Sequence, residues 1–329
     1  MTYLAKPYQN LHQERATAFG TFRSFSKPGH EKPFDLGKAR DQSALWSEIE
    51  IDLDPEVATY WCFMKPQGRP SFSVKLLSDI IGMQRSIEEE YGQRARNGMT
   101  QIKYFVLGSK HPGVFSLGGD LPLFVEKIRA QDRTALRHYA RLCVEAVYNN
   151  AVSFHLPIVT IALVQGDALG GGFEAALACN MIVAERSAKF GLPEVLFNLF
   201  PGMGAYSFLS RRLDGVRAER IIFSGRTYSA EELYEMGLVD LVAEDGQGEH
   251  AVRELIERQR RRHNAYEAVF QARRRVQPVT LEELLDITEI WVDAALRLEE
   301  ADLKRMLRLA AAQERRKPAS QTPQLVAAE

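Results

Sequence analysis

The stretch GDALGGGFEAALAC, from Gly166 to Cys179, decides the fold of this chain. It follows PIVTIALVQ, a β-branched apolar run from Pro157 to Gln165 that has the length of a strand. A triple glycine then precedes a helix of small residues with one acidic residue, Glu174. A helix start leaves its first N–H groups unpaired, and glycine lets a substrate approach them closely. The stretch therefore predicts a strand–turn–helix unit that binds an anionic oxygen, with Glu174 facing the reacting atoms.

Two further blocks add to this pattern. The strand-like run IKYFVLG (102–108) precedes a second glycine turn, HPGVFSLGGDL (111–121). A second glutamate, Glu194, lies in FGLPEVLFNLFPGMGA, and 194 − 174 = 20 residues separate the two glutamates. Taken singly, the glycines could be ordinary turns and each glutamate a solvated or capping residue. Both carboxylates stand in apolar sequence, where a charge needs a reason, so the combination favours a site.

These three blocks, in this order, resemble the crotonase (enoyl-CoA hydratase/isomerase) superfamily over roughly residues 49–242. The stretches FSLGGDL, GLPEVLFNLFPGMGAYSF and ITEIWVDAA (287–295) are more specifically similar to the bacterial diffusible signal factor synthases. The resemblance implies an α/β fold, a crotonase-like spiral of ββα units with a C-terminal α-helical trimerisation region. It also implies dehydration of a 3-hydroxyacyl thioester on acyl carrier protein, followed by thioester hydrolysis. The product would be a cis-2-unsaturated fatty acid signal.

The resemblance also implies roles for individual residues. Glu174 and Glu194 match the two catalytic glutamates, because dehydration needs one carboxylate to take the α-proton and one carboxylic acid to protonate the hydroxyl. The backbone N–H groups of Gly119 and Gly171 match the oxyanion hole. The expected substrate-binding residues are apolar: Trp291 and Leu309 in the acyl tunnel, and Met203 and Phe200 in the FPGMGA turn. Ordinary core packing is the alternative for these four.

Two other functions stay open. One is a plain enoyl-CoA hydratase or isomerase of fatty-acid metabolism, and the other is a non-catalytic crotonase-fold binding protein. Retention of both glutamates argues against the second. Phe173, at a position where small residues are common in hydratases, and the long N-terminal arm put ordinary CoA substrates in doubt.

Composition limits the class of protein. The 329 residues are 45% hydrophobic and 26% charged with a formal net charge of −1, which gives no global attraction to nucleic acid or to an anionic membrane. The three cysteines are widely spaced and the seven histidines show no ligand spacing, so we expect neither a metal nor a cofactor. The N-terminus lacks a secretory h-region, and charged residues break the most apolar segment, 151–184. We therefore expect a cytoplasmic protein without a membrane span.

Local patterns divide the chain into four parts: an irregular arm (1–45), a crotonase catalytic core (46–249), a C-terminal helical region (250–315) and a disordered tail (316–329). Within them we expect a hairpin at 47–65, helices at 73–91 and 120–150, and a last strand at 238–242. Capping boxes are expected at Ser229–Glu232 and Thr280–Glu283.

Two basic clusters, RQRRRH (258–263) and Arg273–Arg275, are either solvated helix faces or docking sites for acyl carrier protein or CoA phosphates. Nucleic acid is a minor alternative, because aromatic residues are sparse among the charges. The family resemblance implies a homotrimer or a dimer of trimers, and a sensor kinase as regulator.

Overall fold

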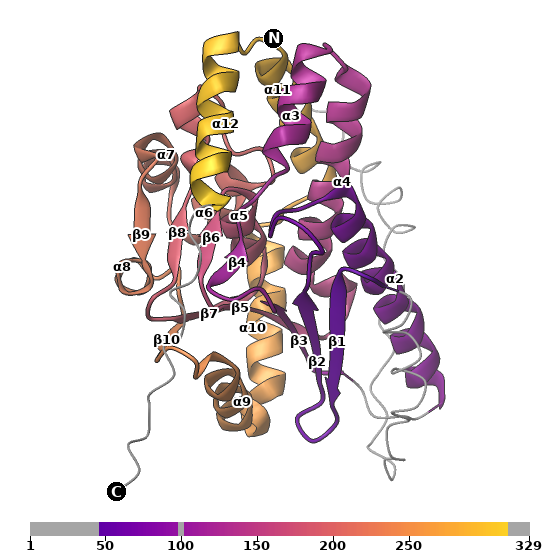
Figure 1. The fold of residues 1–329 in the computed structure, drawn as a ribbon. Coiled ribbons are helices and arrows are strands. Elements are labelled where there is room, and N and C mark those ends of the chain that lie inside the picture. Colours follow the sequence, from indigo (N-terminus) through magenta and orange to yellow (C-terminus); the bar gives the residue numbers. More distant parts are fainter. Residues whose placement is uncertain (1–45, 98–101, 315–329) are drawn as a thin grey trace, which may run out of the picture.

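The computed structural model describes residues 46–97 and 102–314 (Figure 1). The arm expected at 1–45 and the tail expected at 316–329 lie outside the described residues. The expected hairpin is confirmed: β1 (Ile49–Asp54) pairs antiparallel with β2 (Thr59–Met64), in the register Ile49↔Met64. Helix α2 (Val74–Asn97) follows, longer than the expected 73–91.

Two sheets form the centre of the fold. The larger has the strand order β1-β2-β3-β5-β7-β10, and the smaller has the order β4-β6-β8-β9. From β2 to β10 the larger sheet is parallel, as are β4, β6 and β8. The remaining strands are β3 (Tyr104–Ser109), β4 (Val114–Ser116), β5 (Val159–Val164), β6 (Asp167–Leu169), β7 (Met181–Glu185), β8 (Lys189–Gly191), β9 (Thr227–Ser229) and β10 (Leu241–Ala243).

The chain builds these sheets by repeating one unit. Each unit places its first strand in the larger sheet, its second strand in the smaller sheet, and then forms one or more helices: β3–β4–α3, β5–β6–α5 and β7–β8–η2. The expected spiral of ββα units is therefore present. The helices of these units are α3 (Leu121–Arg129), α4 (Arg133–Ala151), α5 (Gly171–Ala178), the 3-10 helix η2 (Pro193–Phe197) and α6 (Ala205–Arg212).

Apolar side chains cover both faces of the larger sheet, as expected for parallel strands. On one face a large core joins the sheet to α2, α4 and α5. On the other face, Trp61, Val106 and Ile161 pack with Val252 and Ile256 of α9. All three cysteines are unpaired and buried, and burial raises the pKa of Cys62 and Cys179 to about 12.

The described part of the chain ends in helices, so the expected C-terminal helical region is present. They are α9 (Gly248–Gln259), η3 (Arg260–Arg262), α10 (His263–Val276), α11 (Leu281–Leu296) and α12 (Glu300–Glu314). Helix α11 packs against α4, and α12 packs against α3 and η2. In Figure 1, α11 and α12 lie beside α3 at one end of the molecule, and α9 and α10 lie at the other.

Two local predictions need correction. The single helix expected at 120–150 is divided into α3 and α4, because Gln131 has a left-handed φ of 52° and Asp132 caps the second helix. The capping box at Ser229–Glu232 is complete, whereas Thr280 accepts the Glu283 N–H without the reciprocal bond. The Glu283 carboxylate is bound instead by Ser207 and Arg211. The described helices include none that is long and apolar enough to span a bilayer.

Candidate active site

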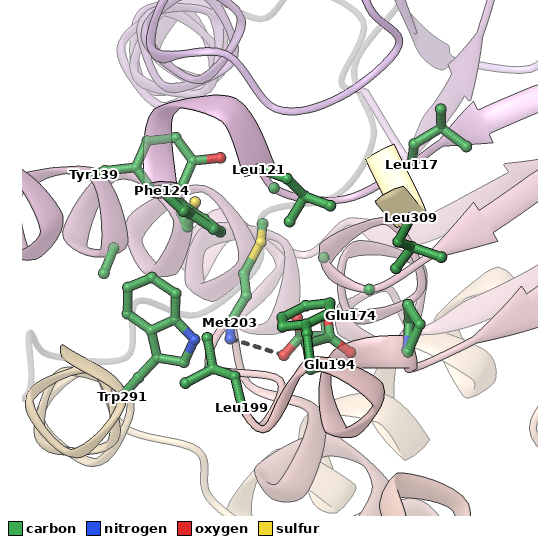
Figure 2. Close-up of a pocket in the computed structure, with 18 residues that line it drawn as sticks. Leu117, Leu121, Phe124, Tyr139, Glu174, Glu194, Leu199, Met203, Trp291 and Leu309 are labelled. Carbon is green, nitrogen blue, oxygen red and sulfur yellow. Dashed lines mark hydrogen bonds between the residues drawn. The ribbon is translucent and has the colours of Figure 1, made fainter. Parts of the chain in front are cut away.

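One cavity of ≈ 60 Å³ gathers most of the residues that the sequence singled out (Figure 2). Its walls come from the loops after β4 and β6, from α3, α4 and α5, from η2 and the turn before α6, and from α11 and α12. The lining residues are Leu117, Gly119, Leu121, Phe124, Tyr139, Ala140, Cys143, Gly170, Gly171, Glu174, Pro193, Glu194, Phe197, Leu199, Gly202, Met203, Trp291 and Leu309.

The Gly119 N–H is a free donor beside this cavity. The carbonyl of the same peptide unit, Gly118 C=O, accepts a hydrogen bond of 2.8 Å from the Phe72 N–H. Because the two groups of a trans peptide point in opposite directions, the Gly119 N–H points away from Phe72. No residue in the described part of the chain accepts a hydrogen bond from it.

The Gly171 N–H, at the start of α5, is the second donor for which the described residues provide no acceptor. The Gly170 carbonyl accepts from the Glu174 N–H at 3.1 Å, so it points along the helix. The Gly171 N–H shares that peptide unit and therefore points out of the helix start, where the backbone dipoles favour negative charge.

Close packing of the two glycine loops brings both donors to one wall. Gly118 has a φ of +87°, and a Cβ there would lie 2.6 Å from the Leu169 carbonyl oxygen and 2.9 Å from the Gly171 nitrogen. Only glycine permits this approach. The arrangement offers two N–H groups to an oxygen bound in the cavity.

Glu174 is buried in the first turn of α5, with 2% of its surface exposed. Its Oε1 accepts the Met203 N–H at 2.8 Å and the Ala205 N–H at 2.9 Å, where α6 begins. The first of these bonds is drawn in Figure 2. Burial raises the pKa of Glu174 to about 7, and the two backbone N–H groups limit that rise.

Glu194 reaches the cavity from η2, and its carboxyl accepts fewer hydrogen bonds than that of Glu174. Its Oε2 is buried and has no hydrogen-bond partner among the described residues. A Cβ on Gly170, which has a φ of +51°, would lie 2.5 Å from Glu194 Oε1, so the absence of a side chain at 170 makes room for this carboxyl. Burial, and then the charge of Glu174, raise the pKa of Glu194 well above its usual range.

The two carboxyls are therefore unequal at neutral pH. Two backbone N–H groups donate to Glu174 and favour its ionised form. For Glu194, burial and the charge of Glu174 outweigh the one backbone N–H, its own, that favours ionisation, so the neutral form is favoured. Two interacting carboxyls that hold one proton between them provide an acid and a base in the same cavity.

The expected apolar walls are placed as follows. Trp291 of α11, Leu309 of α12 and Met203 all line the cavity. The Phe124 ring packs edge-on against the Trp291 ring, with centroids 5.0 Å apart. Phe200 is partly buried against the core and does not belong to the lining.

Sequence reasoning missed the aromatic floor formed by Phe124 and Tyr139. Both lie on helices between the glycine loops, where a buried aromatic residue looks like ordinary core. Their position beside the Gly119 loop follows from tertiary packing. The one local signal was Asp120, which caps α3 and so starts a helix directly after the glycine turn.

The basic clusters lie elsewhere. Arg260–Arg262 form η3, at the end of the molecule away from α11 and α12 (Figure 1). Arg273–Arg275 line a different cavity of ≈ 1060 Å³, whose walls contain neither glutamate. Neither cluster borders the cavity of Glu174 and Glu194. Among the described residues, no group of three His, Cys, Asp or Glu side chains could hold a metal ion.

Comparison with known proteins gives a consistent family. The model of the enoyl-CoA hydratase/isomerase family matches residues 90–296. Mitochondrial methylglutaconyl-CoA hydratase of Rattus norvegicus is 35% identical over 158 residues, 48% of this chain and 48% of that protein. Mitochondrial enoyl-CoA hydratase domain-containing protein 2 of Homo sapiens is 31% identical over 219 residues, 65% of this chain and 70% of that protein. The chain spans about half the length of the methylglutaconyl-CoA hydratases that it matches.

Solved structures share the fold. Enoyl-CoA hydratase from Bacillus halodurans superposes with a TM-score of 0.63 at 24% identity, covering 80% of this chain and 100% of that one. Pseudomonas aeruginosa DspI gives a TM-score of 0.58 at 24% identity, covering 75% and 94%. Human mitochondrial delta3-delta2-enoyl-CoA isomerase gives 0.67 at 17% identity, covering 82% and 100%. At these identities the likeness concerns the fold alone.

Proposed function

This chain belongs to the enoyl-CoA hydratase/isomerase family, and from that premise we propose that it dehydrates a 3-hydroxyacyl thioester and then hydrolyses it. The substrate is a 3-hydroxyacyl chain on acyl carrier protein, and the product is a cis-2-unsaturated fatty acid that serves as a signal. One observation carries the proposal: a single cavity holds two glutamates, two free backbone N–H groups and an apolar wall from α11 and α12.

Dehydration uses the carboxyl pair and both N–H groups. The ionised carboxylate takes the α-proton, and the thioester oxygen becomes an enolate oxygen bound by the N–H groups of Gly119 and Gly171. The neutral carboxyl gives its proton to the 3-hydroxyl group, the C–O bond breaks and water leaves. The pair still holds one proton, now on the other carboxyl.

Hydrolysis can follow in the same cavity. The carboxylate left ionised by dehydration removes a proton from water, and the resulting hydroxide equivalent attacks the thioester carbon. The tetrahedral intermediate places its negative charge on the same oxygen, so the same N–H groups stabilise it. The C–S bond then breaks, the thiolate of the carrier takes a proton, and the acid is released.

The apolar wall supports a long acyl chain. Trp291, Leu309 and Met203 come from three separate segments and border the space beside the carboxyls. The ITEIWVDAA segment that supplies Trp291 is among the stretches that resemble the signal synthases. Apolar side chains at these positions favour the alkyl part of an acyl thioester.

The test is direct. The purified chain is incubated with 3-hydroxydecanoyl acyl carrier protein and, separately, with the matching CoA thioester, and products are identified by mass spectrometry. The proposal expects free cis-2-enoic acid from the carrier substrate and none from a Glu194→Ala variant. Accumulation of enoyl thioester without free acid would remove the hydrolysis step. Extracts of cells that express either chain provide the same comparison in vivo.

A plain enoyl-CoA hydratase is the second candidate. The names of the relatives from Rattus norvegicus and Homo sapiens favour it. It predicts fast hydration of 2-enoyl-CoA and no free acid from either thioester. A non-catalytic binding protein would give neither product, and the paired buried glutamates speak against it.

We also propose that the chain assembles into a homotrimer or a dimer of trimers. Helix α10 has no buried residue, and Val269 and Val276 are 65% and 79% exposed. Apolar side chains on an uncovered helix favour contact with another subunit. Light scattering of the purified chain measures the mass, and a monomer at micromolar concentration would contradict the proposal.

A further inference from the structure

Two segments run side by side next to the cavity, like the first residues of a parallel ladder. The Leu117 N–H donates to the Pro70 carbonyl at 2.7 Å, and the Phe72 N–H donates to the Gly118 carbonyl at 2.8 Å. Phe72 and Gly119 form an isolated parallel bridge. In such a ladder the next bond would run from the Asp120 N–H to the Phe72 carbonyl.

The Tyr139 hydroxyl links these two groups. It accepts the Asp120 N–H at 3.1 Å and donates to the Phe72 carbonyl at 2.5 Å. Tyr139 reaches this point from α4, and its side chain is buried. Burial raises the pKa of Tyr139 well above its usual value, so the hydroxyl keeps the proton that it donates.

These bonds fix the peptide units on both sides of Gly119. The Phe72 N–H holds the unit before it, and the Tyr139 hydroxyl holds the unit after it. The Gly119 N–H cannot turn without breaking one of the two. We propose that Tyr139 is a positioning residue of the oxyanion hole, whose hydroxyl sets the direction of the Gly119 N–H. The inference rests on the proposed use of that N–H in catalysis.

The hydroxyl can be separated from the ring that carries it. The Tyr139 ring packs edge-on against Phe124, with centroids 5.1 Å apart and planes at 85°. Phenylalanine at 139 would keep this packing and remove only the oxygen. The Asp120 N–H and the Phe72 carbonyl would then lose their shared partner, and the loop could close up or rotate.

The kinetic test compares Tyr139→Phe with Tyr148→Phe. Tyr148 is on the same helix but lines the other cavity. We expect Tyr139→Phe to lower kcat about 10- to 100-fold for dehydration and hydrolysis alike, because small misplacements at a reacting centre are costly. KM should stay within about twofold, and the pH profile should keep its shape because both glutamates remain. Tyr148→Phe should match the wild type.

A binding test measures how well the oxyanion hole stabilises an enolate, without any turnover of substrate. A 3-ketoacyl pantetheine thioester forms an enolate that absorbs in the near ultraviolet, so difference spectra report how well the protein stabilises that oxygen. Tyr139→Phe should lower the bound enolate fraction about tenfold at equal ligand saturation. Unchanged kcat and an unchanged enolate fraction, or a loss confined to the melting temperature, would overturn the inference.

The two proposals can fail separately. A wild-type chain that releases no free acid, combined with a Tyr139→Phe variant that stabilises less enolate, would refute the proposed substrate and support the positioning role. If the wild-type chain releases free acid and the Tyr139→Phe variant is equally active, the proposed substrate is supported and the positioning role is refuted. A wild-type chain that forms no bound enolate would refute the positioning role.

Discussion

Gly202 lies directly against the indole of Trp291, so closely that a Cβ atom at position 202 would overlap the ring. Gly202 precedes α6 and Trp291 is on α11, so the missing side chain is what lets the C-terminal helix bring its tryptophan to the cavity. This apolar wall of the cavity therefore depends on a glycine in the FPGMGA turn.

Replacing that glycine should damage the wall. Gly202→Ala should push Trp291 outward and weaken the binding of long acyl substrates more than that of short ones. At about 0.8 kcal/mol per buried methylene, loss of contact with two methylenes raises KM roughly tenfold. Steady-state kinetics over a series of chain lengths measures this. Gly68→Ala is the matched control, because a Cβ there meets nothing within 4 Å. An effect independent of chain length would contradict the prediction.

Each glutamate should be required for turnover. Glu174→Gln and Glu194→Gln keep the shape of the side chain and remove its acid–base chemistry, so each should lower dehydration by about 10² or more. Stopped assays of product formation, with circular dichroism to check folding, measure the loss. Glu126→Gln, at an exposed pair with Lys127, serves as control. Near-wild-type turnover by either cavity variant would refute the two-carboxyl mechanism.

The Gly171 N–H can be deleted with little harm to the helix. Proline is well tolerated at the first position of a helix, which Gly171 occupies in α5, and it lacks the N–H. Gly171→Pro should therefore lower dehydration and hydrolysis together, by about 10²-fold. Gly171→Ala keeps the donor and should retain more activity, although its Cβ would lie 3.1 Å from Met203 Sδ. If the proline variant lost only dehydration or only hydrolysis, the two reactions would not share one oxyanion hole.

The contribution of Glu174 to stability should fall as pH rises toward neutrality. Burial raises the pKa of Glu174 to about 7, whereas in the unfolded chain a glutamate titrates near about 4.3. Between these values Glu174 binds more protons in the folded protein than in the unfolded chain, so its contribution to the free energy of unfolding decreases with increasing pH. The Glu174→Gln variant lacks this titrating carboxyl, so its free energy of unfolding does not include this decrease with pH. Its stability relative to the wild type should grow between about pH 4 and pH 7, by an amount on the order of 3 kcal/mol.

Urea titrations at a series of pH values measure this difference. Parallel curves for the variant and the wild type would show that Glu174 titrates normally in the folded protein. Glu194→Gln should act in the same direction, because burial and the neighbouring charge also raise the pKa of Glu194.

Local sequence patterns predicted the frame of the site well. The strand before Gly166, the helix from Gly171 and the hairpin at the start all depend on periodicity and glycine punctuation, which act over a few residues. The break between α3 and α4 escaped prediction because neither glycine nor proline marks it. A glutamine in a left-handed conformation makes the turn, and only packing against the rest of the fold specifies that conformation.

The walls of the cavity were harder to predict. Trp291 and Leu309 were expected there through family resemblance, since nothing in an amphipathic helix tells which neighbour its apolar face will meet. Tyr139 was missed for the same reason. Its role depends on hydrogen bonds to Phe72 and Asp120, which are 67 and 19 residues away in sequence. The carrier-docking role considered for Arg260–Arg262 relied on charge alone, and charge does not specify a location.

The position of the wall residues in the sequence has a consequence for the order in which the site is synthesised. Both glutamates and both glycine loops precede residue 203, whereas the wall residues Trp291 of α11 and Leu309 of α12 follow more than 80 residues later. The ribosome synthesises the chain from its N-terminus to its C-terminus, and earlier segments can fold while later ones are still being synthesised. A nascent chain would thus carry its acid–base groups before it could hold an acyl chain. The cavity is therefore complete only after α11 and α12 have been synthesised and have packed against α3, α4 and η2.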